Sequence, residues 1–196
     1  MMKLAETAPI AQAALPLAEL RTTLRLPEGF SDDGGHDARL QDCARAALAL
    51  VEARTGKVLL TRSFSWMLER WSTPDRQAFP VAPILGLDAL GFRGTDGGLT
   101  SLNIAEFRII DDMHRPALAA RNGALPGIPV GATLELSFTA GFSSAWEGVP
   151  PDLREAVLIL AAEIFDGSPH TAPSIPAAVE LLLQRYRSVG LRGIGR

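Results

Sequence analysis

Apolar residues recur at helical spacing near both ends of this chain, around a central region where they alternate with polar ones. The longest helical pattern covers residues 37–55, where Asp37 suits the N-cap and Gly56 follows the last turn. Positions i, i+3, i+4 and i+7 of this helix predict one buried stripe: Leu40, Cys43, Ala44, Ala47, Leu48 and Val51. We interpret Cys43 as a small core residue, because a reactive thiol would require an open, electropositive setting.

Three small, uncharged residues lie on a second face of the same helix, namely Ala46, Ala49 and Ala53. An ordinary surface helix would carry lysine and glutamate at such positions. We therefore predict that this alanine face contacts another copy of the chain or a partner. The pattern indicates assembly rather than catalysis.

Three further helices are predicted from the same kind of spacing. Leucines mark one over residues 16–24, and a stripe of apolar residues marks another over residues 176–186. Pro151 and Asp152 suit the first turn of a third, which is apolar nearly all round and is therefore expected in the core.

The central region reads as β structure. Alternation predicts strands over residues 58–60, 63–71, 106–110 and 132–138. The segment that begins with Pro80 and Pro83 is predicted to be an edge strand or an extended arm, because proline cannot donate a hydrogen bond to a sheet. Residues 94–98 are predicted to form a hairpin turn. We expect a small antiparallel sheet of about five or six strands.

These elements predict an α+β fold, in which a small bundle of about four helices carries an inserted antiparallel β subdomain and a flexible C-terminal tail. The expected boundaries are a single domain over residues 1–187, with helices in 16–55 and 151–187 and the β insertion in 58–140. The tail would cover residues 188–196.

The end of the chain is basic and contains no acidic residue after residue 184. Its arginines, and the two apolar residues that sit between glycines, are Arg185, Arg187, Leu191, Arg192, Ile194 and Arg196. Such a glycine-jointed strip suits ordering against an acidic groove of a partner, and a merely frayed terminus is the alternative.

Composition narrows the class of protein. With 196 residues and 47% hydrophobic content, the chain can bury a core, and a net charge of −3 excludes a strongly basic nucleic-acid binder. The N-terminus makes a poor signal peptide, and no apolar run is long enough to cross a bilayer, so we expect no membrane partner.

The sequence contains no complete motif for an enzyme or a cofactor. Ser143 in the segment GFSSA faintly resembles a nucleophile elbow, but the helix that such a motif needs does not follow it. The three histidines lack metal-ligand spacing, and the glycines after residue 189 are not framed by a strand and a helix as a phosphate loop would be. We predict no catalytic, metal or cofactor site.

The aromatic residues offer one alternative. Phe64, Trp66, Trp71 and Trp146 could form a stacking platform for single-stranded nucleic acid. Acidic residues accompany the nearby arginines, so we favour packing of these rings in the core.

The order of motifs is similar to that of a known family. The motifs are E-x-R-T-G-K-x-L at residues 52–59, T-A-G-F at 139–142 and V-P-P-D-L-R-E-A at 149–156. In this order they resemble the head–tail connector (adaptor) proteins of long-tailed bacteriophages and of phage-derived gene transfer agents, over residues 16–187. Family members often carry a longer arginine-rich loop where this chain has residues 166–174.

The resemblance implies a structural protein of the virion or particle neck, assembled in the bacterial cytoplasm. Roughly twelve copies would form a ring beneath the portal protein, extend the DNA channel and dock the tail or stopper protein. DNA would pass without sequence-specific binding. The resemblance also implies that the C-terminal segment inserts into the portal. Two alternatives stay open: a small serine hydrolase that uses Ser143, and a monomeric binding module.

Overall fold

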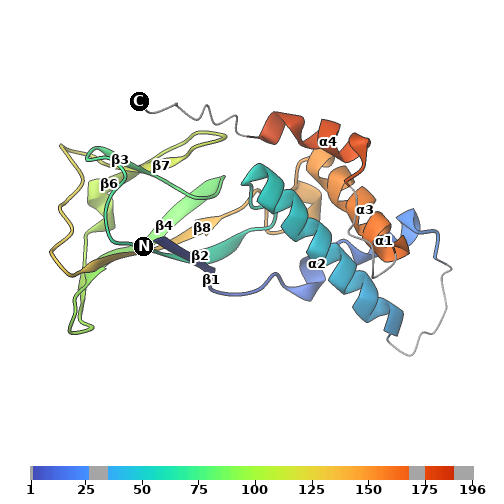
Figure 1. Cartoon of the computed structure of the whole chain (residues 1–196), viewed down its shortest axis with the longest axis horizontal. Helices are drawn as coiled ribbons and strands as arrows, with labels where there is room; N and C mark the ends of the chain where they lie inside the picture. Colours follow the sequence, from blue (N-terminus) through green and yellow to red (C-terminus); the bar gives the residue numbers. More distant parts are fainter. Residues whose placement is uncertain (1, 27–34, 168–174, 188–196) are drawn as a thin grey trace, which may run out of the picture. The chain divides into compact units, whose positions relative to one another are not determined.

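The computed structural model describes residues 2–26, 35–167 and 175–187, and it contains α-helices and antiparallel sheets (Figure 1). The fold is α+β, as the sequence pattern predicted. The chain divides into two compact units, which we describe separately. The helical unit comprises residues 15–57 and 150–196, and the β unit comprises residues 1–14 and 58–149.

The helical unit is built around two long helices that pack against each other, α2 (Gly35–Thr55) and α3 (Pro151–Asp166). The shorter helices α1 (Leu17–Thr23) and α4 (Ala177–Leu183) both pack on α3. A 3-10 turn, Gln184–Tyr186, continues α4, so the helix predicted to reach residue 186 keeps α geometry only to Leu183. No helix in the described part of the chain is long and apolar enough to span a bilayer.

The buried stripe of α2 consists of the residues that their spacing in the sequence predicted. All six residues of the stripe are at most 4% exposed. A fully buried leucine side chain contributes about 1.5–3 kcal/mol, so Leu40 and Leu48 are major contributors to this unit. Gly56 ends the helix in the left-handed region, with φ +67° and its N–H bonded to the Glu52 carbonyl at 2.8 Å.

The prediction that Asp37 caps α2 is wrong. The helix begins at Gly35, and Asp37 lies inside its first turn, where it accepts a hydrogen bond from the guanidinium of Arg21 in α1. A carboxylate is favoured both at the N-cap and throughout the first turn, so the sequence alone did not separate the two positions.

The β unit holds two sheets rather than the single sheet that the sequence predicted. The larger has the order β1 (Met2–Glu6), β2 (Arg62–Leu68), β8 (Thr133–Ala140), β4 (Ile84–Arg93) and β5 (Leu99–Ser101). The smaller has the order β3 (Arg76–Ala78), β7 (Ala117–Ala120) and β6 (Phe107–Ile110). All pairings in both are antiparallel.

Aromatic rings fill the core of the β unit. Phe64 stacks on Phe138 with 5.4 Å between ring centroids, and Phe79 meets Phe138 edge-on at 5.1 Å. Trp66 is fully buried and lies 5.8 Å from Phe79. Aromatic pairs of this geometry contribute about 0.5–1.5 kcal/mol beyond the area that they bury.

Several strand limits differ from prediction. Residues 58–60 form a buried connection with a single parallel bridge from Leu60 to Ser143, not a strand. The strand predicted over residues 63–71 ends at Leu68. Pro80 and Pro83 precede β4, as expected for residues that cannot donate to a ladder. The predicted turn at residues 94–98 joins β4 to β5.

Candidate functional site

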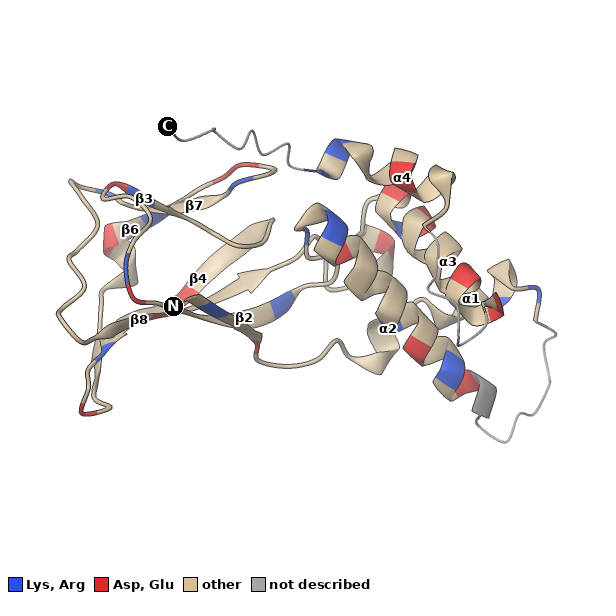
Figure 2. Ribbon diagram, viewed as in Figure 1, with Lys and Arg blue, Asp and Glu red and all other residues tan. Residues whose placement is uncertain are grey.

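The alanine face of α2 is an exposed surface. Ala46, Ala49 and Ala53 are all exposed, and at 100° per residue they lie on the side of the helix opposite the buried stripe. In the view of Figure 2, acidic and basic residues mark the two ends of α2. Asp42 and Arg45 lie one turn before Ala46 and Ala49 in the sequence of the helix. The structure thus leaves three small side chains exposed for a contact, with charged residues beside them.

Glu180 of α4 forms ion pairs with one residue of α2 and with one residue that follows α4. Arg54 near the end of α2 pairs with Glu180 of α4 at 2.8 Å, and Arg187 pairs with the other oxygen of Glu180 at 2.8 Å. Each such exposed pair contributes no more than about 1 kcal/mol, so the pair of Arg54 and Glu180 adds little to stability beyond linking α2 to α4.

A second exposed apolar feature of the helical unit lies on α4. Leu181 is 72% exposed, whereas Leu183 on the same helix is 2% exposed. Ala177 and Ala178, one turn earlier, are exposed as well. The sequence analysis did not single out Leu181, because it lies off the predicted stripe of Val179, Leu182, Leu183 and Tyr186, and one apolar residue off a stripe does not by itself indicate a contact.

The predicted partner-binding tail falls largely outside the described residues, since Leu191, Arg192, Ile194 and Arg196 are among those that the structure does not describe. The two described members are held by acids of the helical unit. Arg185 lies 3.5 Å from Asp152 and 5.1 Å from the Tyr186 ring centroid, and Arg187 pairs with Glu180. These pairs hold the start of the basic strip against α3 and α4.

The buried side chain of Tyr186 also holds the end of α4 against α3. Its hydroxyl donates a 2.7 Å hydrogen bond to Oδ1 of Asp152, in the first turn of α3. Burial, and then the hydrogen bond and charge of Asp152, raise the pKa of Tyr186 to about 12. The phenol is therefore a structural donor at neutral pH.

Ser143 has none of the surroundings of a catalytic serine within the described structure. Its Oγ accepts a hydrogen bond from the Ala145 N–H at 3.1 Å, and its carbonyl accepts one from Thr61 at 2.8 Å. A short 3-10 turn, Trp146–Gly148, follows it rather than the helix of a nucleophile elbow. These contacts are those of a turn at the end of a strand.

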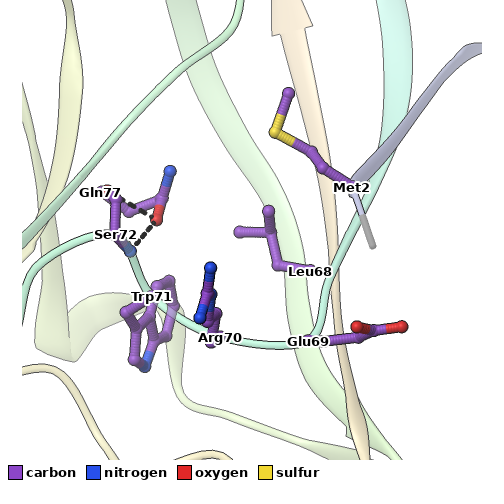
Figure 3. A pocket seen from close by; sticks show the side chains of 7 residues that line it. All are labelled: Met2, Leu68, Glu69, Arg70, Trp71, Ser72 and Gln77. Atoms are coloured by element: carbon purple, nitrogen blue, oxygen red, sulfur yellow. Dashed lines mark hydrogen bonds between the residues drawn. The ribbon is translucent and has the colours of Figure 1, made fainter.

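An open pocket of about 610 Å³ lies in the β unit beside the start of β1 (Figure 3). Its lining is Met2, Leu68, Glu69, Arg70, Trp71, Ser72 and Gln77. The polar groups on one side satisfy each other, because Gln77 Oε1 accepts from the N–H of Ser72 at 2.7 Å and from its hydroxyl at 3.0 Å. This lining offers no nucleophile paired with a base.

The remaining candidates are structural. Burial raises the pKa of the Cys43 thiol, and within the described ranges no three histidine, cysteine or acidic side chains are grouped to hold a metal ion. Phe64, Trp66 and Trp146 are buried, and the Trp71 indole donates to the Pro126 carbonyl at 2.7 Å. The rings therefore pack in the core, as favoured from the sequence, and do not form a stacking platform.

Comparisons with known proteins identify close structural relatives. No family model and no curated protein matches the chain. Among solved structures, a chain from the neck of an empty gene transfer agent (GTA) particle, computed with C6 symmetry, is 39% identical with a TM-score of 0.89, covering 97% of this chain and 98% of that one.

Two further structures agree with it. A chain from the virion of a native GTA particle is 39% identical, with a TM-score of 0.87 and coverage of 97% of both chains. A chain from the neck of a native GTA particle, computed with C12 symmetry, is 36% identical, with a TM-score of 0.84 and coverage of 97% of this chain and 98% of that one.

Proposed function

The chain belongs to the family of gene transfer agent neck proteins, and we propose that it is the head–tail connector of such a particle. In this role it forms a ring beneath the portal, extends the DNA channel and docks the tail or stopper protein. The observation that carries the proposal is the similarity along 97% of the chain to neck structures computed with C6 and C12 symmetry.

Ring closure requires two different faces of each copy, because a cyclic assembly is built from heterologous contacts. The exposed alanine face of α2 supports one half of such a contact, since small side chains let another backbone approach closely. The exposed Leu181 of α4 is a candidate for the opposite half, as a single large apolar side chain fits against small side chains. We assign roughly twelve copies to the ring on the basis of the family resemblance.

The C-terminal segment is assigned to the portal. Its arginines, together with Leu191 and Ile194, suit an acidic groove with apolar pockets, and its start is held on α3 and α4 by the pairs of Arg185 and Arg187. The net charge of −3 suits a channel along which DNA moves without sequence-specific binding.

Electron microscopy of the full chain with its portal tests this function. A stacked ring on the portal supports the connector. A chain that stays monomeric with the portal and binds a ligand in a strongly salt-dependent way would instead indicate a binding module. Loss of a hydrolytic activity in Ser143→Ala, with intact assembly, would indicate a hydrolase.

Ala49→Glu tests the alanine face. We expect complete rings on the portal to become at least about tenfold rarer, because a contact weakened by about 1.4 kcal/mol per subunit has that effect on each association. The free energy of unfolding should change by no more than about 0.5 kcal/mol, since the position is exposed. Ring counts in negative stain and chemical denaturation measure the two effects.

The same substitution at Ala105, an exposed position in the β unit, is the matched control and should leave the rings intact. If Ala49→Glu unfolds the chain, the alanine face is core. If its rings are as frequent as those of the unaltered chain, the subunit contact lies elsewhere.

A further inference from the structure

Among the described residues, no element covers either edge of the five-stranded sheet. The three residues of β5 are all exposed, and in β1 only Leu4 is partly buried. Each edge also presents a large apolar side chain, Met2 at 60% and Leu99 at 53% exposure. Proteins usually protect an exposed edge with charge, proline or a bulge, and β5 (Leu99–Ser101) carries no charge and no proline.

The two edges run in the same direction and end at the same level of the sheet. Every neighbouring pair from β1 through β2, β8 and β4 to β5 is antiparallel, so β1 and β5 are parallel to each other. One row of directly paired residues crosses the whole sheet: Met2, Leu68, Leu134, Phe92 and Thr100. Met2 and Thr100 are therefore opposite ends of one row.

The backbone groups that point away from β1 can be identified from its ladder. Thr7 donates to the Ser63 carbonyl at 3.0 Å and continues the β1–β2 register. Because bonded pairs alternate in an antiparallel ladder, Lys3 and Ala5 bond toward β2. The N–H and C=O groups of Met2 and Leu4 then point outward.

The outward-pointing backbone groups of β5 follow from its ladder with β4. Gly94 donates to Gly98 at 2.9 Å and Leu102 donates to Leu90 at 2.8 Å, so Thr100 between them bonds toward β4. The N–H and C=O groups of Leu99 and Ser101 point outward. Within the described part of the chain, neither residue makes a backbone hydrogen bond to an element other than β4.

The two free edges fit each other in this register. In a parallel ladder, a residue donates to the residue before its partner and accepts from the residue after it. With Met2 of one copy beside Thr100 of the next, the Met2 N–H meets the Leu99 carbonyl, and the Ser101 N–H meets the Met2 carbonyl. A cyclic neighbour presents its β5 edge with the required direction, because rotation about the ring axis carries one edge toward the other.

We propose that β1 of one copy pairs in parallel with β5 of the next copy, with Met2 beside Thr100, and so joins the sheets of neighbouring subunits around the ring. This pairing rests on the proposed ring and adds to it a second contact, made by the β unit. The occupant of each edge is a second copy of this chain, since the free groups, direction and level of one edge match those of the other.

Disulfide trapping tests the pairing in rings assembled on the portal from the full chain. The double variant Met2→Cys with Thr100→Cys is made in a Cys43→Ala background. Its two thiols lie on the same face of the sheet, and they are side by side only where β1 of one copy pairs with β5 of the next copy. Within a copy the two strands are about 19 Å apart, from four strand spacings of about 4.8 Å. We expect oxidation to give a ladder of covalent oligomers, and Met2→Cys with Leu99→Cys, on opposite faces of the sheet, to give none.

A second substitution tests the hydrogen bond itself. Ser101→Pro removes an N–H that donates to no other element among the described residues, so the disulfide ladder should be lost, whereas Ser101→Thr should keep it. Hydrogen exchange on the unaltered chain gives an independent reading, because the Ser101 amide should become protected on assembly.

The outcomes separate the two proposals. Rings on the portal without a ladder, and without protection of Ser101, would overturn the edge pairing and leave the connector function standing. A disulfide dimer from Met2→Cys alone would indicate that two β1 strands pair instead, which also overturns it. Absence of any ring would overturn both.

Discussion

Tyr186 is the only tyrosine of the chain, so its ionisation can be measured directly. Burial and the adjacent Asp152 raise its pKa to about 12, from an ordinary value of 10.0. A spectrophotometric titration of the native protein should therefore show a single phenol ionising near pH 12. In Asp152→Asn, the pKa should fall part of the way, since burial, the largest cause, remains.

The same shift makes stability depend on pH. The folded pKa lies above the unfolded one, so the stabilisation is complete below about pH 10 and is lost as pH rises through about 12. The free energy of unfolding should fall by roughly 2–3 kcal/mol over this interval. An ordinary phenol titration near pH 10 in the folded protein, unchanged by Asp152→Asn, would contradict the buried hydrogen bond.

At the scale of elements, α4 offers a matched pair of positions. Leu181→Gln changes a side chain that is 72% exposed, so it should alter the free energy of unfolding by no more than about 0.5 kcal/mol. Leu183→Gln places an amide where the leucine is 2% exposed and should cost about 2–4 kcal/mol. Chemical denaturation measures both.

The functional outcome separates the two variants further. If Leu181 forms half of the subunit contact, Leu181→Gln should reduce rings on the portal while the monomer stays folded. Normal ring counts in that variant would show that Leu181 faces solvent in the assembly, and the partner of the alanine face would have to be sought on another element.

The elements also show what the sequence could predict. Periodicity within one helix specified the buried stripe of α2, because each turn of a helix is local in sequence. The strand β1 was missed, since five residues with two charges stand out only once they pair with β2, some sixty positions away along the chain. The division of the strands into two sheets was not predicted for the same reason, because strand pairing depends on contacts between residues that are distant in sequence.

One of the candidate surfaces could be predicted from the sequence, and the other could not. Exposure of Ala46, Ala49 and Ala53 follows from spacing around one helix, and the sequence anticipated it. The matching edges of β1 and β5 depend on register through five strands, which no local pattern contains. Ladder alternation could only be read from backbone hydrogen bonds.

At the scale of the whole molecule, the C-terminal segment should be separable from the fold. Deletion of residues 189–196 removes residues beyond the last described turn, while Tyr186, Arg185 and Arg187 keep their contacts with α3 and α4. The free energy of unfolding should therefore change by no more than about 0.5 kcal/mol, but binding to the portal should be lost.

Sedimentation of the full and shortened chains with the portal measures that loss. Arg192→Gln with Arg196→Gln keeps the length and apolar residues of the segment and isolates its charge. If the segment docks in an acidic groove, this variant should bind with lower affinity and a weaker dependence on salt, because fewer charges are screened. Undiminished portal binding by the shortened chain would contradict the assignment of the segment to the portal and would place the portal contact on the folded units. Full binding by the charge variant would show that Leu191 and Ile194 contribute most of the binding energy of the segment.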